Sequence, residues 1–123
     1  MAEEALSVCQ PVRQDGRRHR ALNPFAQADA QLLAIVNCGE FALNGFRNRD
    51  VRAKLYEPTD DPKRLRRQMG ATGRRLRLLR AHGLIKKVSK THRYLLTDKG
   101  RRIITALLAA RQASTEKLTA LAA

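Results

Sequence analysis

The sequence has no tryptophan, and aromatic residues make up 4% of its 123 residues. Its hydrophobic core must therefore be built from aliphatic side chains, and few rings are available for stacking unpaired bases. It has no run of about 20 apolar residues, so no membrane-spanning helix is expected. Its two cysteines, Cys9 and Cys38, lack the C-x-x-C spacing of metal and redox sites. The N-terminus lacks the features of a secretory signal, and we expect reduced thiols in a cytoplasmic protein.

The sequence also lacks the motifs of the common enzyme classes. It contains no nucleophile motif, no phosphate-cradling glycine loop and no cluster of histidines with carboxylates. Its histidines, His19, His82 and His92, are scattered among basic residues. His82 is expected at the end of a helix, where a cation is stabilised by the helix dipole. We therefore predict no enzymatic activity, no metal and no cofactor.

Positive charge is abundant and unevenly placed. The formal net charge is +14, and all of the excess lies between Arg47 and Arg102. That segment has 19 lysines and arginines against five acidic residues, whereas the rest of the chain has six of each. Self-repulsion of this size destabilises a compact fold, so a polyanion is the natural partner. Nucleic acid is the leading class of partner, and an anionic membrane surface is the second.

The segment from Asp61 to Gly83 is predicted to be one long helix with two different faces. Asp61 is a suitable N-cap, Pro62 suits the first helical position, and Gly83 suits the residue after the last turn. Apolar or small side chains recur at spacings of four and three residues and predict a buried stripe; they are Leu65, Met69, Thr72, Leu76 and Leu79. Gly70 and Gly73 interrupt the basic side, which indicates either a local weakness or close approach by a partner.

The other segments predict a mostly α-helical fold with a small β-hairpin. Asn23-Pro24 indicates a first helix over about 24–38, and Asn48 indicates a second over about 49–57. Residues 41–43 are expected as a short strand. The period then changes to two residues, which predicts strands over 84–88 and 92–96. Thr97 is expected to cap a last helix that begins at Asp98 and has a long apolar side.

This order of elements resembles the winged helix-turn-helix, in which one helix enters the DNA major groove and a hairpin, the wing, contacts the backbone. The segment Leu76–Ile85 resembles the family pattern L-x-x-L-x-x-x-G-L-I at the end of the recognition helix. The segment Tyr94–Gly100 resembles the pattern Y-x-L-T-x-x-G that closes the wing in regulators of the MarR type. The helix that begins at Pro62 is longer than the family's recognition helix. The resemblance implies an α-β-α-α-β-β-α fold and double-stranded DNA as the partner.

Candidate DNA contacts follow from the helical angles and from the hairpin. Lysine and arginine supply phosphate contacts, and arginine can also pair with guanine. The predicted contacts are Lys63, Arg66, Arg67, Arg74 and Arg77 on the long helix, Arg49 and Arg52 on the second helix, and Lys90, His92 and Arg93 on the wing. The expected role is transcriptional regulation or an accessory function of a mobile element.

Two alternative functions remain at this stage. An arginine-rich helix also suits structured RNA, and a winged helix can serve as a protein-interaction module with an acidic partner. We expect three parts of the chain: a flexible tail over 1–22, the winged-helix domain over 23–113 and a helical extension over 114–123. The short basic cluster Arg17–Arg20 in the tail is either solvated or an arm along a phosphate backbone. The apolar side of the last helix is consistent with a homodimer.

Overall fold

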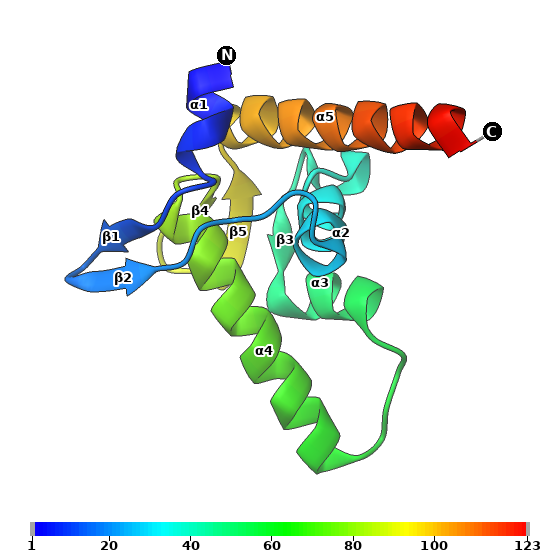
Figure 1. The fold of residues 1–123 in the computed structure, drawn as a ribbon. Coiled ribbons are helices and arrows are strands. Elements are labelled where there is room, and N and C mark those ends of the chain that lie inside the picture. The colour runs from blue at the N-terminus through cyan, green and yellow to red at the C-terminus, as the bar shows by residue number, and fades with distance from the viewer. Residues whose placement is uncertain (1, 123) are drawn as a thin grey trace.

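The structure, a computed structural model, describes residues 2–122 and the side-chain burial of residues 4–121. It is mostly helical, as predicted, and it has two small antiparallel sheets where the sequence predicted one hairpin. The elements in chain order are α1 (Ala2–Ser7), β1 (Val12–Gln14), β2 (Arg17–His19), α2 (Gln27–Val36), the 3-10 helix η1 (Gly39–Phe41), β3 (Phe46–Arg47), α3 (Asn48–Leu55), α4 (Pro62–Ala81), β4 (Ile85–Lys87), β5 (Arg93–Leu96) and α5 (Asp98–Ala122). Figure 1 shows α5 lying across one end of the molecule while α4 extends away from the other end.

The core gathers aliphatic side chains from nearly every element. Leu33, Leu76, Leu79 and Ile104 have no exposed surface. Phe46, on β3, is also fully buried, and its ring stacks on Tyr94 with 6.0 Å between the ring centroids. The prediction of a core built from aliphatic residues is therefore confirmed, with Phe46 as its fully buried aromatic ring within the described part of the chain.

The three-stranded sheet has the order β3-β5-β4, and all its strands are antiparallel. The predicted hairpin is confirmed as β4 and β5, with Ile85 opposite Leu96 and Lys87 opposite Tyr94. The third strand differs from the prediction. Residues 41–43 form no strand, and Phe46 pairs instead with Tyr94 at the edge of the hairpin. A strand of two residues is defined by that pairing rather than by its own sequence.

The start of α4 has the predicted local geometry. Asp61 is the N-cap, and its Oδ1 accepts a hydrogen bond from the amide of Lys63 at 3.1 Å. The helix continues without a break to Ala81, and Gly83 follows with a φ of +75°. The glycines therefore do not divide the helix. Only its C-terminal half is packed in the core: Thr72, Leu76 and Leu79 are buried, whereas Met69 is 46% exposed.

Residues 2–22 do not form the unstructured tail that the sequence suggested. They form α1 and the hairpin β1–β2, and Val8 and Leu22 are almost fully buried in the core. Helix α1 lies against α5, where Glu4 pairs with Arg102 at 2.8 Å. This packing gives the N-terminal segment a defined place beside α4 and α5 (Figure 1).

Helices α2 and α3 start differently from the predictions. Asn23 does not cap α2, because it forms a turn in which its Oδ1 accepts from the amide of Phe25 at 3.0 Å. Helix α2 begins four residues later, at Gln27. Asn48 is the first residue of α3 rather than its cap. The amide of Arg47 donates a hydrogen bond to the carboxylate of Asp50 at 2.8 Å. This bond, rather than the side chain of Asn48, caps the start of α3.

The last helix, α5, begins as predicted and extends beyond the body of the protein. Thr97 accepts a hydrogen bond from the amide of Gly100 at 2.8 Å and thereby caps it. Ile103, Ile104 and Leu107 are buried under α1 and α2, but none of the residues from Leu108 to Leu121 is buried. Leu121 is 76% exposed. The far half of α5 therefore carries apolar side chains that the rest of this chain does not cover (Figure 1).

Candidate nucleic-acid interface

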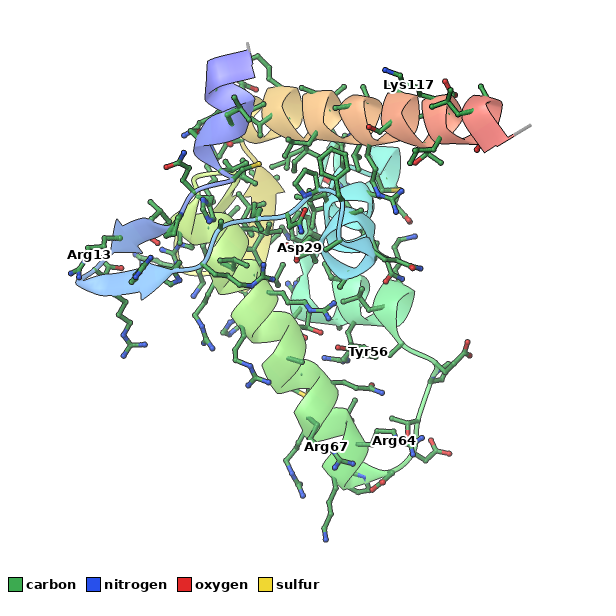
Figure 2. All side chains as sticks on the ribbon, viewed as in Figure 1. Arg13, Asp29, Tyr56, Arg64, Arg67 and Lys117 are labelled. Atoms are coloured by element: carbon green, nitrogen blue, oxygen red, sulfur yellow. The ribbon has the colours of Figure 1, made fainter. Side chains whose placement is uncertain are left out.

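The most prominent feature of the surface is the N-terminal half of α4, which projects from the body (Figure 1). None of the residues from Pro62 to Ala71 is buried, and Thr72 is the first buried residue of the helix. Ten helical residues span about 15 Å. Figure 2 shows Arg64 and Arg67 pointing into solvent from this projecting part.

One side of α4 carries the five predicted contacts of this helix. Lys63, Arg66, Arg67, Arg74 and Arg77 are all exposed. At about 100° per residue their side chains fall on the side away from the buried Leu76 and Thr72. We call these five residues the α4 basic face. Their exposure is consistent with the sequence prediction, and their role as contacts stays a prediction.

The cations of this region are not neutralised by the protein's own carboxylates. Within residues 4–121 the ion pairs are Arg20 with Asp29, Lys54 with Glu40, and Arg102 with Glu4. None of the ten predicted contact residues takes part in them. Exposed ion pairs contribute little stability, but internal pairing would have cancelled the field that attracts a polyanion. The positive field of the α4 basic face is therefore available to a partner.

A groove connects α4 to α3 and to the wing. It has a volume of about 390 Å³, and its lining residues include Arg49, Arg52, Met69 and His92. Asn48 holds the two helices together here, because its amide donates to the carbonyl of Met69 at 3.1 Å. The structure thus brings the predicted residues of α3 and His92 of the wing to one place beside α4.

The other two wing residues have different surroundings. Lys90 is exposed at the tip of the hairpin, where its φ of +62° reverses the chain. Arg93 is half-buried, and its guanidinium donates to the carbonyl of Asn44 at 2.5 Å. Arg93 therefore fastens the wing to the turn before β3, whereas the side chain of Lys90 is free to reach outward.

Several cations near these residues were not among the ten predicted contacts, although Arg17 belongs to the N-terminal cluster that the sequence offered as a possible arm along a phosphate backbone. Arg47 lines the α3 groove, and Arg80 and Arg17 line a second hollow between α4 and the β1–β2 hairpin. Figure 2 shows Arg13 at the outer end of that hairpin. Part of the signal for the hairpin was present, because Asp15-Gly16 is a dipeptide that favours a two-residue turn, but the flanking residues lack the alternating apolar pattern of strands.

Two further observations concern metal sites and membrane-spanning helices in the part of the chain that the structure describes. No three histidine, cysteine, aspartate or glutamate side chains come together as a group that could hold a metal ion. No helix there has the length and apolar character needed to cross a bilayer.

Comparisons with protein-family models, with curated proteins and with solved structures found no match to this chain.

Proposed function

We propose that this protein binds double-stranded DNA and that the projecting half of α4 enters the major groove. The observation that carries the proposal is the α4 basic face, whose cations have no carboxylate partners among the described residues. Mutual repulsion among these cations is relieved when a polyanion binds to the α4 basic face. The proposed role is transcriptional regulation or an accessory function of a mobile element.

The dimensions of α4 fit a major groove. An α-helix with its side chains is about 10–12 Å across, and the major groove of B-DNA is about 12 Å wide and 8.5 Å deep. The projecting residues Pro62–Ala71 extend about 15 Å. In the proposed complex they reach the base edges before the body of the protein meets the DNA backbone. Arg66 and Arg67 would then lie within the groove, where arginine can pair with guanine.

The arrangement of the remaining elements supports a winged helix-turn-helix. Helices α2, α3 and α4 precede the hairpin β4–β5, and β3 pairs with β5. Arg49, Arg52 and His92 lie together in the groove beside α4. In the proposed complex they contact phosphates on one side of the major groove, and Lys90 at the wing tip contacts the backbone beyond them.

Duplex DNA suits this geometry better than RNA. The major groove of A-form RNA is deep and too narrow for side chains to read, so a projecting helix has no place to enter it. Single strands are bound largely by stacking on aromatic rings. Phe46 is fully buried and Tyr94 is half-buried in contact with it, whereas Phe25 is 60% exposed but lies beside α1 and α5 rather than on α4. An RNA complex is therefore an outcome of the test rather than the proposal.

We also propose that two copies associate through the far half of α5. Leu118 is 67% exposed and Leu121 is 76% exposed, on a helix that extends past the body. A dimer would place two α4 helices on two half-sites, as in other helix-turn-helix proteins.

The test is fluorescence anisotropy with a labelled random-sequence duplex of about two helical turns. Between about 50 and 200 mM salt, log affinity should fall against log salt with a slope of about −4 to −5, which corresponds to about five phosphates. Replacing Arg67 by glutamate should weaken binding more than about tenfold, because a phosphate or base contact becomes a repulsion. Arg101→Glu is the matched control, since it makes the same change of charge at an exposed position near the start of α5, outside α4 and outside the proposed dimer surface.

Three outcomes would overturn the proposal. The first is an affinity that does not depend on salt, and the second is an equal loss of affinity in the Arg67→Glu and Arg101→Glu proteins. The third is a structured RNA hairpin that displaces the protein from duplex DNA at lower concentration than unlabelled duplex does. Selection of bound fragments from random duplexes would then define the target sequence.

A further inference from the structure

The hairpin β1–β2 is a second basic hairpin beside α4. Its strands pair Val12 with His19, Arg13 with Arg18, and Gln14 with Arg17. The turn consists of Asp15 and Gly16, whose φ angles of +53° and +75° are those of the type I′ turn that joins tightly twisted strands. A two-residue turn of this kind fixes the register, so the arginines have defined positions along the hairpin.

Three contacts anchor the hairpin to the body. The guanidinium of Arg20, just after β2, donates twice to the buried carboxylate of Asp29, at 2.8 and 2.9 Å. This guanidinium holds the pKa of the Asp29 carboxyl below its usual range. The carbonyl of Arg20 accepts a hydrogen bond from Nε2 of His82 at 2.8 Å, at the end of α4. The amide of Leu22 donates to the carbonyl of Val8 at 2.9 Å, so the hairpin cannot swing freely.

A hollow of about 360 Å³ separates the hairpin from the C-terminal half of α4. Arg17 and His19 line it from the hairpin, and Arg77 and Arg80 line it from the helix. Asp15, at the turn, is the acidic residue on the rim, and among the described residues it forms no ion pair with these arginines. Three guanidinium groups around one hollow repel one another unless an anion lies between them.

Because Arg77 also belongs to the α4 basic face, the hollow is continuous with the proposed DNA-binding surface. Guanidinium groups bind phosphate oxygens through pairs of parallel hydrogen bonds, and several of them around one site favour phosphate over a simple carboxylate. A duplex that receives the projecting half of α4 brings backbone phosphates toward this end of the face.

We propose that the hollow between β2 and α4 binds a backbone phosphate of the same DNA duplex, which makes the β1–β2 hairpin a second wing. This inference rests on the proposed function, since it assigns a further part of the same surface. Arg17, Arg77 and Arg80 hold the phosphate, and the outward pair Arg13 and Arg18 lies along the neighbouring backbone. The footprint on DNA is therefore wider than one helix and one wing would give.

The test compares salt dependences of duplex binding for the full chain and for two double variants. Arg17→Ala with Arg80→Ala should make the slope of log affinity against log salt shallower by about one, because one phosphate contact is lost. The control is Lys99→Ala with Arg101→Ala, two exposed cations at the start of α5, and it should keep the slope of the unmodified protein. Arg17→Lys with Arg80→Lys keeps the charge and should restore most of the slope.

Thermal unfolding of each variant checks the fold, and the exposure of Arg17 and Arg80 predicts unchanged melting temperatures. If the unmodified protein does not bind duplex DNA, the proposed function fails. If it binds with the expected slope and the Arg17→Ala, Arg80→Ala protein shows that same slope, only the second wing fails. Loss of binding to anionic phospholipid vesicles in this variant, with an unchanged DNA slope, would assign the hollow to a lipid headgroup and overturn the inference.

Discussion

Two glycines inside α4 allow a sharp test of which side of the helix meets a partner. A glycine in a helix interior costs about 0.8–1 kcal/mol relative to alanine. Gly70 and Gly73 are both helical, and both lie in the middle of the continuous helix from Pro62 to Ala81. Replacing either by alanine should therefore stabilise the protein, provided that the added methyl group meets nothing rigid.

The structure indicates that both methyl groups can be accommodated. At Gly73 the nearest atom is Nδ2 of Asn48 on α3, at 3.7 Å, which is an ordinary van der Waals contact. At Gly70 it is the guanidinium tip of Arg74, at 3.3 Å, and a flexible side chain can move away. Each variant should gain about 1 kcal/mol, which corresponds to a rise of about 3–5 °C in melting temperature for a domain of this size.

The two variants should differ in DNA binding. Gly73 faces α3, so its methyl group lies against Asn48 and away from the partner. Gly70 lies on the exposed side between Arg67 and Arg74, where an added methyl group would be pressed against the bound DNA. Overpacking a close contact costs about 1–3 kcal/mol, and we expect a loss of affinity of about tenfold for Gly70→Ala alone.

Thermal and urea unfolding measure the stability, and anisotropy with the same duplex measures the affinity. A fall in stability for both variants would refute the assignment of this part of α4 as a continuous helix. Equal affinities of Gly70→Ala and Gly73→Ala would show that the side of the helix carrying Gly70 does not closely approach DNA. The Gly73→Ala protein serves as the control for general effects of helix stability on binding.

Three further predictions concern the body and the assembly. Gly100→Ala should lower the free energy of unfolding by more than about 3 kcal/mol, because the new methyl carbon would lie 2.0 Å from the carbonyl oxygen of Leu84. Urea unfolding measures this loss, and an unchanged midpoint would contradict the contact. Burial lowers the pKa of His82, so the unfolded chain takes up a proton at higher pH than the folded protein does. The stability that neutral His82 contributes should be complete well above the ordinary histidine pKa of about 6.5 and should fall as the pH drops below it. A His82→Gln protein with the same decline would assign the pH dependence to another group. Sedimentation of the unmodified protein should detect a dimer, and the double variant Leu118→Asp, Leu121→Asp should be a monomer. If the unmodified protein is a monomer at high concentration, the dimer proposal is wrong.

Local signals in the sequence predicted the elements whose ends are fixed by their own residues. Asp61-Pro62 and Gly83 set the ends of α4, and Thr97 caps α5, because each of these residues satisfies or frees backbone groups beside it. The same reasoning placed the α2 cap at Asn23, where the structure has a turn stabilised by this side chain. An asparagine before a proline suits both geometries, and local sequence cannot distinguish them.

Features that depend on distant partners were not predictable in this way. The apolar period extends from Leu65 to Leu79, but only the second half of α4 meets the core, because periodicity shows a face and not the reach of its neighbours. Strand β3 exists through its pairing with Tyr94. The five predicted contact residues of α4 are all exposed, whereas the role of the ten predicted residues in binding stays a prediction. The hairpin that carries Arg17 and Arg18 was not predicted, because the residues on either side of Asp15-Gly16 are mostly charged and show no alternation of apolar and polar residues.

The projecting half of α4 has a consequence for how binding and folding are coupled. Isolated helices shorter than about 12–15 residues are marginal in water, and the ten residues Pro62–Ala71 have no buried side chain. Their helical form depends on the cap at Asp61, on the bond from Asn48 to Met69, and on continuity with the buried turns beyond Thr72. Repulsion among closely spaced cations opposes it. A polyanion removes that repulsion, so the partner that this face attracts also stabilises the helix that presents it.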